Sequence, residues 1–347
     1  MGSARDPGRP ARQRDLRLPA ARRPGRLHPR HSAQKGLARE FLRSSGGAPK
    51  LKLEKTSIVV DAFPAIDSAG LYIAEMDGLF AAQGLHVTIV PVTDPPPSTQ
   101  TLINGQVQGK YDITAGDYVT YIDNELGGKA KLRIIAEASF LQPNVLTLLV
   151  KSGSSINEIG QLKGRTVSVN APDDIGTLLV DSLLVEHGIS PKLVKFNNGV
   201  AFPNVAQTLE SNEVSAAFSP EPFVSLDEEG YGIEELADLD QGSTQDFPIQ
   251  GYAVTQAWAD KYPNTLKAFT TALSQGQEIA DTNRAAVEKA VHTYLGVTST
   301  AAAFISLPTF PLGVDAVRLQ RVVSAMVRFG LLPEQDSSFK ISSMIGS

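Results

Sequence analysis

Hydrophobic and polar positions at the start of the main body follow first the period of a strand and then that of a helix. The β-branched run KTSIVVDAF (55–63) predicts a buried strand. Apolar side chains in residues 69–83 recur at helical spacing, and Gly84 follows where helices commonly close in a left-handed conformation. The run LHVTIVPV (85–92) predicts a second strand, so this segment is expected to form a β-α-β unit.

The same alternation continues as far as residue 255, after which the pattern becomes helical. Residues 101–104 are expected to form a short helix, and residues 111–122 a third strand, a turn and another helix start. Further strands are expected in residues 130–140, 145–153, 164–172, 191–197 and 247–255, and helices in residues 173–188, 264–282 (after Pro263), 284–295 and 314–332. Strands that alternate with helices predict an α/β fold with a parallel or mixed sheet, followed by a helical C-terminal region.

Two parts of the pattern are repeated. The segment after the first strand, Asp61–Pro64, resembles Asn170–Pro172, and QTLINGQV (100–107) resembles QTLESNEV (207–214). Each copy of the second repeat is followed by a short strand, a turn and a new helix. We therefore expect two similar lobes, with a chance likeness between two β-α-β units as the alternative.

Composition narrows the class of protein. A chain of 347 residues with 42% hydrophobic and 20% charged residues is typical of a soluble globular protein with two domains. It has no run of about 18 apolar residues, so no membrane span is expected. The chain has no cysteine, which excludes disulfides, thiolate metal sites and cysteine catalysis.

Charge is distributed unevenly. Residues 1–50 hold 13 basic and 3 acidic residues (+10), and the remaining 19 basic and 34 acidic residues give residues 51–347 a charge of −15. Such an acidic body does not attract nucleic acid by its general field. Residues 1–50 are rich in Arg, Pro and Gly and have no apolar h-region, which predicts disorder and no secretory signal. We consider three interpretations of residues 1–50: a nucleic-acid-binding arm, a transit peptide, and a wrong start or shifted reading frame in a GC-rich gene. We favour the last.

Catalytic motifs are missing from the body. There is no GxGxxG, P-loop, GxSxG or HExxH, and its histidines (His86, His187 and His292) are scattered. By contrast, four strands are followed by good helix starts: Asp67–Ser68, Gly116–Asp117, Asp173–Asp174 and Glu221–Pro222. In open α/β sheets, strand carboxyl ends and helix amino ends line the ligand crevice, so the pattern predicts a small-molecule site. Simple helix caps are the structural alternative.

Residues 55–330 resemble the solute-binding proteins of ABC importers for nitrate, sulfonate, taurine and thiamine-pyrimidine precursors. The resemblance is carried by YIAEMDGLFAAQGLHVTIVPV (72–92), INEIGQLKGRTVSV (156–169), SAAFSPEPF (215–223) and WADKYPNTLKAFTTAL (258–273) in this order. It implies a two-lobed type II periplasmic-binding fold with a central cleft. The first lobe would comprise residues 55–149 and 252–347 and the second residues 150–251, with a hinge near Val150–Lys151 and Gln250–Gly251.

The resemblance also implies the role, the partners and the location. The solute would close the lobes, and permease subunits of the importer would recognise the closed form. We expect a monomer with no cofactor, no metal and no catalytic residue, located in the periplasm or at the cell surface. Family members often carry a lipid-bearing Cys that this sequence lacks, although RSSGGAPK (43–50) resembles the linker that follows such a Cys.

The family's pocket residues map onto loops of both lobes, and several aromatic side chains among them could sandwich a flat solute. The expected ligand-binding residues are Phe63, Pro64, Asp67, Ser68, Gly116, Asp117, Tyr118, Phe140, Asn144, Asn170, Gly176, Thr177, Glu221 and Phe223.

Acidic residues and no Arg or Lys occur in this set, so a neutral or cationic nitrogenous solute, such as an aminopyrimidine, fits it better than a sulfonate or nitrate. The alternatives are an enzyme on the same fold, such as a relative of thiamine-pyrimidine synthase, and a sensory ligand-binding module. The synthase relies on a Cys-rich segment that this chain lacks.

Overall fold

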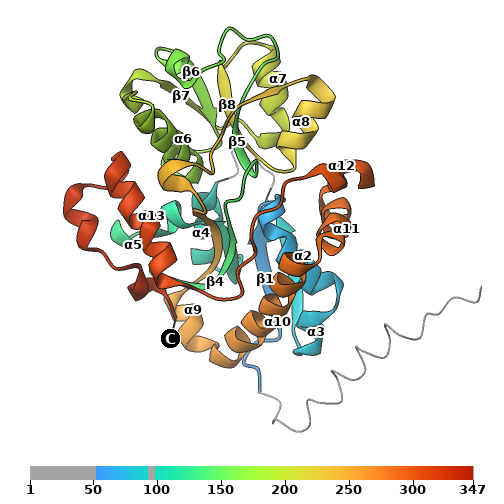
Figure 1. Ribbon diagram of the computed structural model, residues 1–347. Coiled ribbons are helices and arrows are strands. Elements are labelled where there is room, and N and C mark those ends of the chain that lie inside the picture. Colours follow the sequence, from blue (N-terminus) through green and yellow to red (C-terminus); the bar gives the residue numbers. More distant parts are fainter. Residues whose placement is uncertain (1–51, 93–97, 347) are drawn as a thin grey trace, which may run out of the picture. The chain divides into compact units, whose positions relative to one another are not determined.

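The computed structural model describes residues 52–92 and 98–346. The expectations for residues 1–50 lie outside the described residues. Two five-stranded sheets form the framework of the body (Figure 1). The first has the order β2-β1-β3-β10-β4 and contains β1 (Ser57–Ala62), β2 (His86–Pro91), β3 (Ile113–Asp117), β4 (Leu132–Phe140) and β10 (Pro248–Thr255). The second has the order β7-β6-β8-β5-β9 and contains β5 (Leu146–Val150), β6 (Thr166–Val169), β7 (Lys195–Asn198), β8 (Ala216–Pro220) and β9 (Glu234–Asp238).

The two sheets are built on the same plan. In the first, β1 is parallel to β2 and β3, and β10 is antiparallel to β3 and β4. In the second, β6 is parallel to β7 and β8, and β5 is antiparallel to β8 and β9. The repeat in the sequence therefore reflects two lobes with equivalent strand orders, named here the first and the second lobe after their sheets.

Helices pack around both sheets. Those of the first lobe are α2 (Ala69–Met76), α3 (Leu79–Ala82), α4 (Thr99–Val107), α5 (Tyr118–Leu126), α9 (Gln256–Lys261), α10 (Pro263–Thr282), α11 (Arg284–Leu295), α12 (Ser299–Phe304) and α13 (Ala316–Phe329). Those of the second are α6 (Ile175–Glu186), α7 (Val205–Glu210) and α8 (Phe223–Tyr231). Short 3₁₀ turns are η1 (Ile66–Ser68), η2 (Ile159–Leu162), η3 (Pro191–Leu193), η4 (Phe202–Asn204), η5 (Gly242–Thr244), η6 (Glu334–Ser338) and η7 (Ile341–Met344). The helical C-terminal region and the place of Pro263 at the start of α10 are confirmed.

The first predicted helix differs from the structure at its start and in its middle, whereas its expected end at Gly84, in a left-handed conformation (φ 82°), is confirmed. It is two helices, α2 and α3, because Gly78 adopts a left-handed conformation (φ 72°) between them. Neither Asp67 nor Ser68 caps it. The Ser68 hydroxyl instead donates to the carbonyl of Phe63 at 2.8 Å, and the Asp67 carboxylate accepts from the Ser139 hydroxyl. Strand β9 was also missed, because the acidic sequence EELAD lacks the β-branched residues of a strand.

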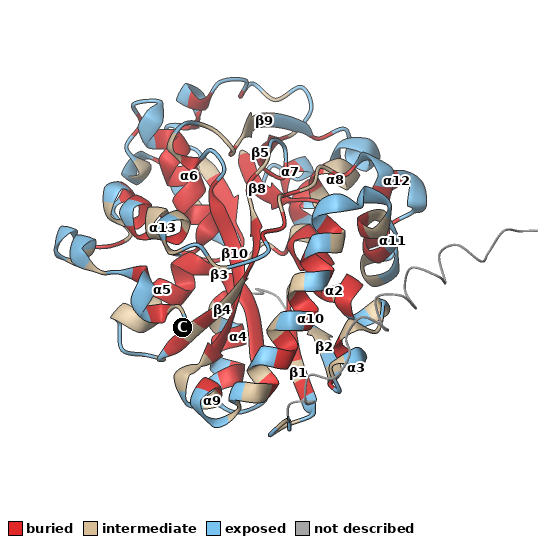
Figure 2. Cartoon of the chain, turned by 60° about the horizontal axis from the view of Figure 1, so that its bottom comes forward, coloured by how far each residue is buried: buried red, intermediate tan, exposed pale blue. Residues whose placement is uncertain are grey.

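The central strands form the core of each lobe. Every residue of β3, β5 and β8 is buried, as Figure 2 shows in red. The chain passes to the second sheet between Phe140 and Leu146 and returns between Asp238 and Pro248, a few residues before each predicted crossing. The two crossings are tied together, since the Leu141 amide donates to the carbonyl of Phe247 at 2.8 Å. Within the described ranges, no helix is long and apolar enough to cross a membrane.

Candidate ligand site between the lobes

A cavity of about 40 Å³ lies at the carboxyl ends of parallel strands from both sheets. Such a volume has room for a few waters or a compact solute. Seven lining residues come from the first lobe, namely Phe63, Ala65, Asp67, Thr99, Asp117, Ile249 and Gln250. Seven come from the second, namely Leu146, Asn170, Asp174, Ile175, Phe202, Phe218 and Pro220. Because neither lobe encloses the space alone, its shape depends on how the lobes are closed.

Asp117 is placed by the junction of β3 and α5. It is the last residue of β3 and caps α5, accepting from the amide of Thr120 at 2.9 Å and from the Thr120 hydroxyl at 2.9 Å. Its own amide donates to the Thr99 hydroxyl at 3.1 Å, which fixes a second lining residue. Burial raises the pKa of Asp117, although these hydrogen bonds partly oppose the shift.

Asp174 has the equivalent position in the second lobe. It caps α6 by accepting from the amide of Thr177 at 3.2 Å, and it is 3% exposed. Burial raises its pKa well above the usual range, and the negative charge of Asp117 adds to this rise. The two capping carboxylates thus come from different lobes and line the same cavity.

A third carboxylate, that of Asp67, comes from the turn η1. It is 4% exposed, and burial raises its pKa while the hydrogen bond from Ser139 opposes the rise. Among the residues that the structure describes, no Arg, Lys or His lines the cavity. The electrostatic character of the site is thus set by acidic groups without a basic partner.

Two amide groups line the cavity without using all their hydrogen-bonding atoms. The Oδ1 atom of Asn170 and the Nε2 atom of Gln250 have no hydrogen-bond partner, although both residues are buried. Aromatic rings complete the wall, with Phe202 and Phe218 packed edge to face at 6.0 Å between centroids. The cavity can therefore offer polar contacts from both lobes together with apolar ring faces.

The structure brings Phe63, Asp67, Asp117 and Asn170 of the predicted set to the cavity. Two predicted glycines support the wall from behind. A Cβ atom on Gly116 would lie 2.3 Å from Thr99, and one on Gly176 would lie 2.9 Å from Phe218. Both glycines thus leave space for a lining side chain rather than line the cavity themselves.

The other predicted residues lie away from the cavity lining, and some have a different local role. Pro64 and Ser68 belong to the loop before α2, and the Thr177 hydroxyl donates to the carbonyl of Ala171. Tyr118 is fully buried against Tyr121, because its side chain points from α5 into the first lobe.

Phe140 lies under the guanidinium of Arg318 (5.0 Å), Asn144 is exposed in the first crossing with a φ of 65°, and the Phe223 ring contacts Phe202 (5.9 Å).

Glu221 joins the lobes instead of facing the cavity. Its carboxylate accepts from the Ser225 hydroxyl at 2.7 Å within the second lobe and from the Ser306 amide at 2.9 Å in the first. Its carbonyl accepts from the amide of Ile66 at 3.3 Å. Glu221 therefore connects the two lobes next to the loop that carries Asp67.

Sequence reasoning missed most of the second lobe's wall and the β10 contribution. The lining residues absent from the predicted set are Ala65, Thr99, Leu146, Asp174, Ile175, Phe202, Phe218, Pro220, Ile249 and Gln250, although Asp174 was expected at a helix start beside the crevice. The sequence repeat could have predicted part of this wall. Strand β8 has the position in the second sheet that β3 has in the first, so Phe218 and Pro220 correspond to Ala115 and Asp117.

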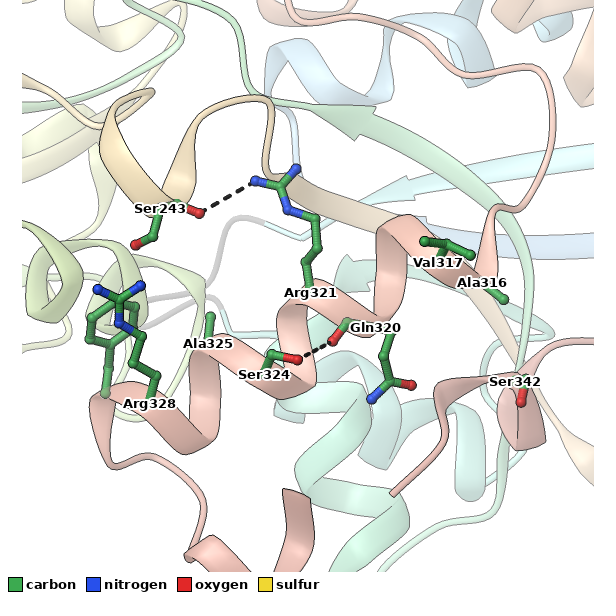
Figure 3. Close-up of a pocket in the computed structure, with 10 residues that line it drawn as sticks. Ser243, Ala316, Val317, Gln320, Arg321, Ser324, Ala325, Arg328 and Ser342 are labelled. Atoms are coloured by element: carbon green, nitrogen blue, oxygen red, sulfur yellow. Dashed lines mark hydrogen bonds between the residues drawn. The ribbon is translucent and has the colours of Figure 1, made fainter. Parts of the chain in front are cut away.

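A larger hollow of about 500 Å³ runs along α13 and η5 (Figure 3). It is lined by Ser243, Ala316, Val317, Gln320, Arg321, Ser324, Ala325, Arg328, Phe329 and Ser342. The guanidinium of Arg321 already donates to the carbonyls of Asp246 (2.8 Å), Gln245 (2.6 Å) and Ser243 (3.3 Å). Since these bonds connect α13 to the second crossing, we assign Arg321 a structural role.

A metal site is not apparent in the part of the chain that the structure describes, where no three His, Cys, Asp or Glu side chains are grouped closely enough to hold an ion.

Comparison with known proteins identifies the family of this chain and structures that share its fold. The family model described as "NMT1/THI5 like" matches residues 65–284. No curated protein sequence matches the chain.

Among solved structures, the periplasmic nitrate-binding protein NrtA from Synechocystis PCC 6803 is similar at 16% identity, with a TM-score of 0.71 and coverage of 85% of this chain and 87% of NrtA. The alkanesulfonate-binding protein SsuA from Xanthomonas axonopodis pv. citri, bound to MOPS, is similar at 16% identity (TM-score 0.68, 84% and 99% covered).

A zinc-bound ligand-binding component of an ABC-type import system from Staphylococcus aureus is similar at 12% identity (TM-score 0.70, 84% and 97% covered). These likenesses establish the two-lobed type II periplasmic-binding fold.

Proposed function

The chain belongs to the NMT1/THI5-like family, and we propose on this premise that it is the extracytoplasmic solute-binding subunit of an ABC importer, carrying a small nitrogen-containing solute to permease subunits. The observation that carries the proposal is the cavity between the lobes, to which the helix starts of α5 and α6 each contribute a capping carboxylate. The similar structures named as nitrate-, sulfonate- and ABC-import-binding proteins support the general role.

Binding in such a cavity is coupled to closure. A solute that contacts Asp117 and Asp174 together makes its full set of contacts only when the lobes are closed. Its binding free energy therefore shifts the population toward the closed form by the difference in affinity between the two forms. A change in population, without a chemical step, is sufficient to signal the loaded state to a permease.

The lining favours a solute that donates hydrogen bonds. Asp67, Asp117 and Asp174 can accept hydrogen bonds, and a sulfonate or nitrate placed beside them would be repelled when they are ionised. The nitrogen-containing solute is therefore proposed from the residues of this chain and not from the ligands named for its neighbours.

Thermal-shift measurements on the full chain test the proposal. The panel contains an alkanesulfonate, nitrate, an aminopyrimidine, an amino acid and a polyamine. A ligand at about 100 times its Kd should add about 2.7 kcal/mol to the stability of the folded state. Small-angle scattering with the same ligand should show a smaller radius of gyration, because the lobes close around it. Conversion of a bound solute to product, followed by chromatography, would contradict the binding role and favour an enzyme on this fold.

A further inference from the structure

The cavity holds buried acidic side chains whose charge the lining residues do not balance. Asp67, Asp117 and Asp174 are 4%, 6% and 3% exposed, and their described hydrogen bonds come from hydroxyl and amide groups. Within residues 52–92 and 98–346, no cationic side chain lines the space. Buried carboxylates are normally paired with a positive group, so these three lack the partner that burial demands.

The unpartnered amides are independent evidence for an occupant. Asn170 is 8% exposed and Gln250 is 5% exposed, yet Oδ1 of the first and Nε2 of the second bond to nothing in the protein. Nearly all buried polar groups have a partner, and both of these border the same cavity from opposite lobes. The Asn170 oxygen needs a donor, which adds one more acceptor to the three carboxylates.

Ring faces are available beside these acceptors. Phe63 comes from the first lobe, and Phe202 and Phe218 come from the second. An aromatic face attracts a cation most strongly where water is excluded. The rings can therefore attract a positively charged solute, as the carboxylates can.

The oxygen atoms around the cavity are not arranged to coordinate a bare metal ion. Oxygen ligands must converge within about 2.6 Å of a hard cation. Among residues 52–92 and 98–346, no three acidic or histidine side chains converge in this way. Acceptors that are spread around a wall are better satisfied by a group with several N–H bonds in different directions.

We infer that the solute is a compact organic cation, of the ammonium or amidinium class, whose charge lies between Asp117 of the first lobe and Asp174 of the second. This inference rests on the proposed function and specifies its solute. Without a cation, closure brings two like charges together in a poorly hydrated space; with one, the repulsion becomes two attractions. The charge of the solute is thus the property that closes the lobes.

Three probes of nearly equal shape separate charge from size. Acetamidinium, acetamide and acetate are cationic, neutral and anionic, and each can be titrated into the full chain at pH 8 and constant ionic strength by calorimetry and thermal shift. We expect acetamidinium to bind and raise the melting temperature, while acetamide and acetate do not. Binding of acetate that equals or exceeds binding of acetamidinium would overturn the inference, and so would the absence of any preference among the three.

Variants locate the charge. Asp117→Asn and Asp174→Asn keep helix caps, because asparagine caps as well as aspartate. Each should weaken acetamidinium binding by about tenfold or more, since a buried charge partner is removed. The control is Asp173→Asn, which alters an exposed neighbour with a φ of 53° that asparagine tolerates, and it should bind as the wild type does.

Equal affinities for Asp174→Asn and Asp173→Asn would overturn the assignment. If the aminopyrimidine or nitrate closes the lobes in scattering while acetamidinium does not bind, the cation inference fails and the transport role stands. If acetamidinium binds but scattering shows no closure, the inferred closing role of its charge fails, and with it the proposed function.

Discussion

Replacement of Asp61 by asparagine should make the protein more stable at alkaline pH. Asp61 lies near the end of β1 and pairs with residues of both β2 and β3. It is 0% exposed, and neither carboxylate oxygen has a hydrogen-bond partner. Burial raises the pKa of Asp61 from 3.8 to about 8, and the neighbouring Thr114 side chain and the charge of Lys110 oppose the rise only in part. The native state therefore holds a proton that the unfolded chain releases.

The sign and size of the effect follow from this difference. Between pH 4 and 8 the native state binds more protons at Asp61 than the unfolded state does, so wild-type stability falls as pH rises through this window. A difference of about 4 pKa units, at about 1.36 kcal/mol per unit, limits the stability lost on ionising Asp61 to at most about 6 kcal/mol. Relaxation and water entry reduce the cost of a buried charge, so we expect Asp61→Asn to gain about 2 to 4 kcal/mol at pH 9.

Urea unfolding at pH 5, 7 and 9 measures this effect. The fluorescence of Trp258, the single tryptophan of the chain, reports on the first lobe, which also contains Asp61. The free energies of unfolding are obtained by linear extrapolation. Asp77→Asn is the control, because Asp77 is exposed at the end of α2. A stability difference between Asp61→Asn and wild type that is the same at pH 5 and pH 9 would refute the reasoning.

Three further outcomes are expected. Glu137→Gln should cost about 3 kcal/mol of stability, because Glu137 has a 0% exposed side chain and holds the Arg318 guanidinium at 2.8 Å; an unchanged urea midpoint would contradict this. Gly251→Ala should cost about 1 to 3 kcal/mol, since a Cβ atom would lie 2.4 Å from the Tyr118 hydroxyl, whereas Gly160→Ala, with nothing within 4 Å, should leave the midpoint unchanged. Acetamidinium affinity should rise from pH 5 to pH 8, because burial raises the pKa of the three cavity carboxylates and protons compete with the cation; a flat calorimetric profile would argue against their role.

The sequence predicted those helix caps correctly in which the capping side chain bonds to an amide a few residues away. Asp174 caps α6 through an amide three residues away, and Asp117 caps α5 in the same way. Asp67 has the same type of position but bonds to Ser139, 72 residues further along the chain. A contact over that distance in the sequence depends on how β4 lies beside η1, which periodicity does not encode.

The site was predicted in part for the same reason. Asp67 and Asp117 follow from the rule that ligands bind at the carboxyl ends of strands, and Phe63 and Asn170 were implied by the resemblance to the solute-binding proteins. Phe202 and Gln250 belong to a 3₁₀ turn and to an antiparallel strand, to which this rule does not apply. Tyr118 follows the cavity residue Asp117 directly in the sequence, but its side chain points into the core. The direction of a side chain at a helix start depends on the packing of the whole lobe.

The bond between Leu141 and Phe247 has a mechanical consequence. It ties the two chain crossings to each other, so they can bend together but cannot slide past one another without breaking it. We therefore expect a rotation of the lobes to bend both crossings at once, so that they act as a single hinge. The hinge would then set the direction of the movement, and the occupant of the cavity would decide whether the lobes close.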